Sequence, residues 1–167
     1  MGKGCKKGNS NVYFCARKEA AKYNDRLYSR EETAEILGIS VSSLSDYELG
    51  ITKIVPVDKV VRMAELYHCP ELKAMYCKND CPIGKTMQIA TEVKGIEGSA
   101  LKLIKEFDED SLEEMKQHFV DIAVDGAVSA DEYGELDEIM KKMDQLALVI
   151  SEIRLLGEKI LGEGDER

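Results

Sequence analysis

Residues 30–50 read REETAEILGISVSSLSDYELG, and this stretch decides the fold. It contains two short amphipathic segments, and each of them ends at a glycine, Gly38 and Gly50. Glycine accepts the left-handed backbone conformation that commonly follows the last turn of a helix. The stretch therefore predicts two helices, over 30–37 and 41–49, joined by a tight turn.

The flanking sequence predicts further helices. Ser29 stands three residues before Glu32, which is the spacing of a capping box: the hydroxyl accepts from the Glu32 amide, and the glutamate side chain reaches back. Pro56 suits the start of a later helix, because the first turn does not use its missing N–H. The sequence has no alternating apolar and polar runs of the kind that predict strands. Apolar spacing predicts additional helices over 11–24, 56–67 and 71–77.

Several positions within 29–67 form a recognisable combination. They are the small Ala34, the turn Gly38-Ile39-Ser40, the inward-facing Leu44 and Tyr47, the ending Glu48-x-Gly50, and the proline before the next helix. With them, the segment resembles the Cro/C1-type (XRE) helix-turn-helix regulators; Thr33 departs from their pattern, in which a larger apolar residue is usual. The resemblance covers residues 11–76. It implies a five-helix, lambda-repressor-like DNA-binding domain that acts as a dimer on a partly palindromic operator.

The resemblance places the helix over 41–49 in the major groove of DNA. Valine can contact a thymine methyl group there, serine hydroxyls can pair with several bases, and aspartate can accept from a cytosine amino group. The residues expected at the base edges are Val41, Ser42, Ser45 and Asp46. The residues expected at the phosphates, partly through amides at a helix N-terminus, are Arg30, Ser40, Ser43 and Lys53.

Charge is distributed unevenly along the chain. The net charge is −9, with +3 over residues 1–62 and −12 over residues 63–167. Contact with phosphates must therefore come from the N-terminal part. Because the helix over 41–49 has no lysine or arginine, the surrounding cations would have to supply the attraction. These cations are Arg17, Lys18, Lys22, Arg26, Arg30 and Lys53, together with Lys3, Lys6 and Lys7 of the N-terminal tail.

The C-terminal part, over 99–162, predicts an antiparallel helical hairpin with one long helix over 130–161. The long helix carries a heptad pattern, with Leu136, Met143 and Ile150 at one position and Ile139, Leu146, Ile153 and Ile160 at the other. A two-helix unit buries little apolar surface by itself. We therefore expect a homodimer through these helices, and a domain plan of helix-turn-helix domain (11–77), linker (78–98) and oligomerisation domain (99–162).

The predicted function is a cytoplasmic, sequence-specific and dimeric repressor that binds double-stranded DNA. Nothing in the sequence indicates an enzyme, a cofactor or the run of roughly 18 apolar residues that a membrane helix needs. One alternative is a helical protein–protein adaptor that does not bind DNA, which the acidic total and the uncharged helix over 41–49 favour. A second is a thiol- or metal-responsive form of the regulator.

The thiol- or metal-responsive alternative rests on the cysteines, and one loop is similar to a calcium-binding loop. Five cysteines without a secretion signal indicate reduced thiols. The group Cys69, Cys77 and Cys81, with His68 beside it, is only a weak metal candidate, because its spacing matches no standard zinc motif. Residues 121–132 are similar to a calcium-binding loop, but Ala123 removes a ligand. A helix corner explains the same residues, since Gly126 can end one helix while the serine and glutamate that follow begin the next.

Overall fold

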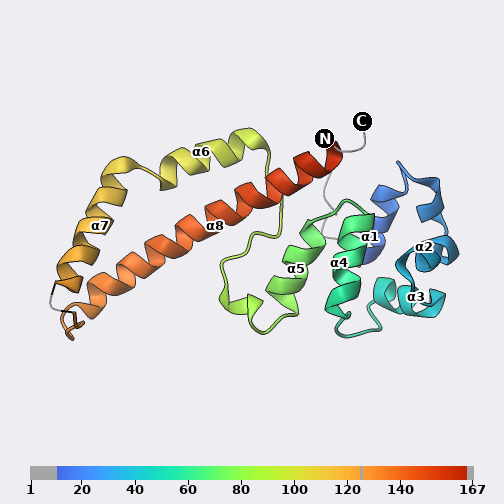
Figure 1. Ribbon diagram of the computed structural model, residues 1–167, viewed down its shortest axis with the longest axis horizontal. Helices are drawn as coiled ribbons and strands as arrows, with labels where there is room; N and C mark the ends of the chain where they lie inside the picture. The colour runs from blue at the N-terminus through green and yellow to red at the C-terminus, as the bar shows by residue number, and fades with distance from the viewer. Residues whose placement is uncertain (1–10, 125, 165–167) are drawn as a thin grey trace.

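The computed structural model describes residues 11–124 and 126–164, and every regular element in them is helical. In chain order the elements are α1 (Val12–Ala20), the 3₁₀ turn η1 (Asp25–Tyr28), α2 (Arg30–Leu37), α3 (Val41–Leu49), α4 (Val57–Leu66), α5 (Glu71–Asn79), the 3₁₀ turn η2 (Gly84–Thr86), α6 (Ile96–Glu106), α7 (Glu109–Ala123) and α8 (Tyr133–Gly164). Helices α1–α5 form an N-terminal domain, and α6–α8 form an elongated C-terminal module (Figure 1). The predicted all-α class is confirmed over the described residues.

The turn between α2 and α3 forms as its sequence predicts. Gly38 adopts the left-handed conformation with φ of 63°, and the Ile39 amide then donates back to the Ala34 carbonyl at 3.0 Å. The Ser40 hydroxyl accepts from the Ser43 amide at 3.0 Å and caps α3. Gly50 ends α3 with φ of 71°. Both helices therefore begin and end at the predicted residues.

The core of the N-terminal domain lies between these five helices. Thr33, the position that departs from the family pattern, is fully buried. Its hydroxyl donates to the Ser29 carbonyl at 2.7 Å, so that no polar group is left without a partner there. The largest apolar side chains that are almost completely buried are Leu27, Leu44, Val60, Met63 and Leu72.

Three local predictions differ from the structure at the helix ends. The first helix ends at Ala20 rather than at residue 24, because η1 follows and turns the chain toward α2. Helix α5 continues to Asn79, beyond residue 77. The capping box at Ser29 is only half formed: its hydroxyl accepts from the Glu32 amide, but the Glu32 carboxylate pairs with Arg26 at 3.3 Å.

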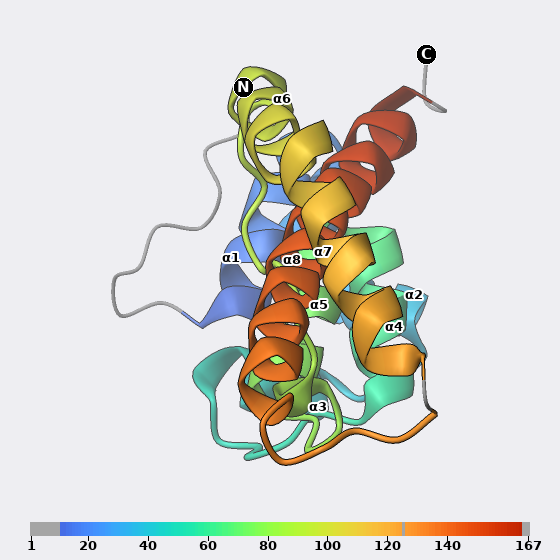
Figure 2. The same ribbon diagram turned by 90° about the vertical axis from the view of Figure 1, so that its left-hand side faces the viewer.

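The predicted linker over 78–98 is partly ordered against α5. A Cβ added to Gly84 would lie 2.1 Å from the Cys77 carbonyl oxygen, so η2 approaches α5 as closely as only glycine allows. The shorter side of the C-terminal hairpin consists of two helices, and Asp108 separates them by capping α7 through the Ser111 amide at 3.0 Å. Both α6 and α7 run alongside α8 (Figures 1 and 2).

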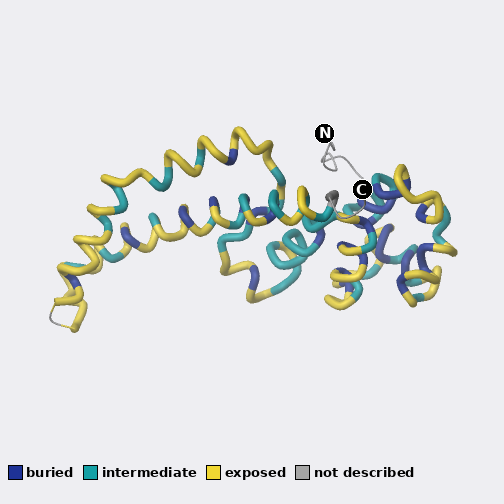
Figure 3. The backbone as a smooth tube through the Cα atoms, turned by 45° about the horizontal axis from the view of Figure 1, so that its top comes forward, coloured by how far each residue is buried: buried dark blue, intermediate teal, exposed yellow. Residues whose placement is uncertain are grey.

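Helix α8 contacts α6 and α7 through a face that differs from the predicted heptad seam. Ile139 and Leu146, from one heptad position, are buried as predicted. Beside them the structure buries Val149, which belongs to neither heptad position. Met143 and Ile150, which the heptad pattern places in the seam, are 46% and 45% exposed. Figure 3 shows this division, with buried positions along one side of α8 and exposed positions along the other. The intramolecular packing against α6 and α7 has selected the buried face.

The loop between α7 and α8 is a helix corner. Gly126 has φ of 73°, and the Glu132 carboxylate accepts from the Ser129 amide at 2.7 Å just before α8 begins. Asp125, a ligand position in the calcium-loop interpretation, lies outside the described residues. In the described parts of the chain, no group of three or more His, Cys, Asp or Glu side chains is arranged to hold a metal ion. A search of the same residues found no helix with the length and apolar character needed to cross a membrane.

Candidate nucleic-acid interface

The outer surface of α3 is open to solvent. Leu44 and Tyr47 anchor one side of the helix in the core, so the opposite side faces outward. Val41 is 40% exposed and Ser42 is exposed, whereas Ser45 and Asp46 are half-buried. Figure 1 shows α3 at the end of the molecule away from α6 and α7, so the acidic C-terminal module does not cover it.

The start of α3 brings several hydrogen-bonding groups together. The hydroxyls of Ser40 and Ser43 lie 2.8 Å apart, and the Ser43 amide is already bonded to Ser40. The first amides of an α-helix have no partner within the helix, and the helix dipole favours an anion beside them. This end of α3 can therefore receive a phosphate oxygen. Lys53, just beyond α3, is exposed and makes no ion pair with any described residue.

A buried cluster of ions fixes the orientation of α3. Glu48 is 3% exposed, and its carboxylate accepts from Arg17 Nη2 at 2.9 Å and from Arg30 Nε at 2.7 Å. The Arg17 Nε also donates to the same carboxylate. Arg17 Nη1 donates in turn to the carbonyls of Leu27 at 2.8 Å and Tyr28 at 3.2 Å. This cluster joins α1, η1, α2 and α3.

The cluster also sets the ionisation of Glu48. Burial disfavours the charged carboxylate and by itself would raise its pKa. The hydrogen bonds from Arg17 and Arg30 outweigh burial and hold the pKa of Glu48 below its ordinary value of 4.5. Glu48 is thus an anion that pairs with two cations inside the domain. Sequence reasoning treated it only as part of the helix ending; its place one turn after the inward-facing Leu44 was the available signal.

The ion cluster around Glu48 changes which cations are available to attract DNA. The prediction that Arg17 attracts DNA is wrong, because Arg17 is 1% exposed and bonded to Glu48. Arg30 also gives its Nε to Glu48, but 35% of its side-chain surface stays exposed. A guanidinium carries five N–H donors, so Arg30 retains donors for a phosphate.

The other predicted cations are mostly paired with neighbours. Lys22 pairs with Glu19 at 2.6 Å, and Arg26 pairs with Glu32. Lys18 lies over the rings of Phe14 and Tyr28. The tail lysines, Lys3, Lys6 and Lys7, lie outside the described residues. Among the cations predicted from the sequence, Lys53 and Arg30 therefore keep donors available beside α3. Arg62, which donates to the Leu37 carbonyl at 3.4 Å, is a further exposed cation at the turn before α3.

The cysteine group gives little support to a metal or redox site. Cys69 is half-buried, and its thiol donates to the Glu71 carboxylate at 3.5 Å. Burial, together with the charge of Glu71, raises the pKa of the Cys69 thiol to about 12. A thiol must lose its proton to bind a metal or to react as a nucleophile. Cys77 and Cys81 are half-buried, and neither joins Cys69 in a metal-binding group within the described chain.

A family model described as helix-turn-helix matches residues 20–73. Residues 20–73 are a Cro/C1-type helix-turn-helix domain. The match spans α2, the Gly38 turn and α3, the parts whose geometry is described above, and it supports a DNA-binding helix-turn-helix regulator. It does not extend over α6–α8. No curated protein and no solved structure matched the chain.

Proposed function

We propose that the protein is a sequence-specific transcriptional repressor that binds double-stranded DNA in the cytoplasm as a homodimer. The observation that carries this proposal is the open outer surface of α3, which the chain's own acidic module leaves uncovered. An α-helix with such a surface fits the major groove, where its N-terminal residues reach base edges. Repression then needs only occupation of the operator, and no catalytic step.

Different residues of the domain serve affinity and sequence preference. Val41, Ser42, Ser45 and Asp46 lie along α3 and would contact base edges, which carry the sequence information. The phosphate contacts would come from Arg30, Ser40, Ser43 and Lys53, on both sides of the same helix.

Dimerisation compensates for the small number of cations beside α3. Each neutralised phosphate contributes to affinity through counterion release, and one domain offers few such contacts. Two domains on adjacent half-sites double that number. The exposed apolar side of α8 outside the α5 junction, with Met140 and Met143, would supply the contact between copies.

The proposal is tested by selecting bound sequences from random DNA with the full chain. An enriched motif with two half-sites about one helical turn apart is expected. Lys53→Ala should weaken binding to all sequences and reduce the salt slope by about 0.9 for each protomer bound. Ser42→Ala should instead change the preference at one base pair, by about 1–3 kcal/mol. Lys116→Ala on α7 is the matched control, since this exposed lysine belongs to the C-terminal module.

Two results would contradict the proposal. If no sequence is enriched and Lys53→Ala behaves like Lys116→Ala, the protein–protein adaptor becomes the better interpretation. If the solution mass equals the 18.7 kDa of one chain at the concentrations that bind the motif, the dimer is wrong.

A further inference from the structure

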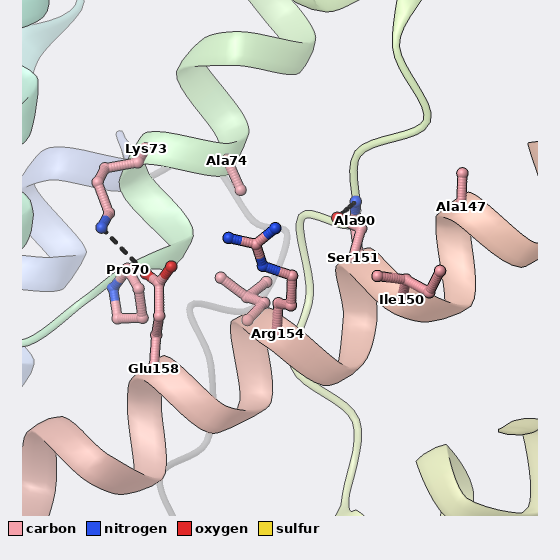
Figure 4. Close-up of a pocket in the computed structure, with 10 residues that line it drawn as sticks. Pro70, Lys73, Ala74, Ala90, Ala147, Ile150, Ser151, Arg154 and Glu158 are labelled. Carbon is pink, nitrogen blue, oxygen red and sulfur yellow. Dashed lines mark hydrogen bonds and ion pairs between the residues drawn. The ribbon is translucent and has the colours of Figure 1, made fainter.

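A pocket of about 390 Å³ lies between α5 and α8, where the N-terminal domain meets the C-terminal module (Figure 4). This volume falls in the range of sites for small organic ligands. One wall is apolar and is formed by Ala74, Ala90, Ala147, Ile150 and Leu155. The pocket is separate from the surface of α3 that we assign to DNA.

Arg154 brings a cation to this apolar wall. Its guanidinium extends from α8 toward the gap between α5 and Ser151 (Figure 4). No described residue forms a hydrogen bond or ion pair with it, although residues 63–167 carry a net charge of −12. Glu158, one turn further along α8, is the nearest acidic residue in the lining, but it pairs with Lys73 at 3.0 Å.

We propose that this pocket binds a small organic carboxylate with an apolar body. The planar guanidinium of Arg154 matches a carboxylate with two parallel hydrogen bonds, which a hydroxyl or an amine cannot reproduce. The wall around Ala147 and Ile150 takes the apolar body out of water. The volume of about 390 Å³ lies near the lower end of the range for small-ligand sites, so it suits a short ligand. Straight-chain acids of six to ten carbons are therefore of the right size.

The pocket lies at the junction of the two parts of the chain. Lys73–Glu158 and Glu71–Lys159 join α5 to α8, and the Ala90 amide donates to the Ser151 hydroxyl at 3.0 Å. A ligand held by Arg154 and Ala74 would add a further connection between α5 and α8. Any effect of the ligand on DNA binding rests on the proposed function, whereas the binding itself does not.

The test is calorimetric titration of the full chain with straight-chain monocarboxylates from butanoate to decanoate, with octanol and octylamine as matched neutral and cationic probes. Saturable binding is expected for the longer acids, at least tenfold tighter than for octanol, and none for octylamine. If no acid binds saturably, or if octanol binds as tightly as octanoate, the proposal is wrong.

Octanoate binding by three variants tests whether the ligand occupies this pocket. Arg154→Gln should weaken octanoate at least tenfold, and Ala147→Trp should block the pocket and abolish binding. Lys141→Gln is the control, because it removes one positive charge from an exposed position of α8 outside the pocket. Both pocket positions are exposed, so these changes should not prevent folding. Equal binding by Arg154→Gln and Lys141→Gln would overturn the assignment to Arg154.

Discussion

Replacing Glu48 by glutamine tests the buried ion cluster that holds α3 in place. The change removes the charge that neutralises Arg17, whose side chain is almost fully enclosed. Breaking a buried pair by removing one partner typically costs about 3–5 kcal/mol, because a charge is left buried without compensation. Arg30 loses its partner too, but it can be hydrated because a third of its surface is exposed.

The expected effect is large for a domain of this size. A loss of 3 kcal/mol corresponds to a fall in Tm of roughly 12–24 °C for a domain of 60–100 residues. Urea unfolding followed by circular dichroism measures the loss, and amide hydrogen exchange over α1 to α3 confines it to the N-terminal domain. Faster exchange is expected there, with α8 unaffected.

Two further variants sharpen the interpretation. Glu35→Gln is the matched control, because this exposed glutamate lies on α2 outside the cluster, and its unfolding midpoint should equal that of the natural protein. The double variant Arg17→Met with Glu48→Leu removes both buried charges and should recover part of the lost stability; the Leu27 and Tyr28 carbonyls, which lose the Arg17 donor, keep the recovery incomplete. A Glu48→Gln variant as stable as Glu35→Gln would refute the reasoning.

The remaining predictions concern pH and two glycines. The pKa of Glu48 is lower in the folded chain than its ordinary value of 4.5, so its stabilisation is fully present above that pH and is lost as the pH falls through the lowered pKa. The urea midpoint should therefore drop more steeply below pH 4.5 in the natural protein than in the double variant; parallel profiles would contradict this. Gly84→Ala should lower the midpoint, because its Cβ cannot occupy a position 2.1 Å from the Cys77 oxygen. Gly98 lies in α6, where an added Cβ would meet no atom within 4 Å, so Gly98→Ala should instead raise stability by up to about 1 kcal/mol. If Gly98→Ala lowers the midpoint as much as Gly84→Ala, the close approach to Cys77 is not the cause of the Gly84→Ala loss.

The residues that end and cap helices were predictable because they act locally. Gly38, Ser40 and Gly50 satisfy backbone groups within about four positions of themselves, so their effect can be read without knowing the fold. The predicted capping box at Ser29 did not form completely, because the Glu32 carboxylate that it requires pairs with Arg26 instead. The base-contacting positions on α3 stay predictions, although the structure does place Val41 and Ser42 at the surface.

The sequence by itself determined the helical class of the described residues, the position of the turn between α2 and α3, and a long amphipathic helix near the C-terminus. Tertiary structure alone decided which cations remain at the surface and which side of α8 is buried. Arg17 and Glu48 lie 31 positions apart, and they meet only because α1 packs against α3. The side of α8 was decided in the same way, because several rows of its apolar residues could form a seam and contact with α6 and α7 selected one. Pairing and burial depend on which surfaces meet, and no local pattern of residues contains that information.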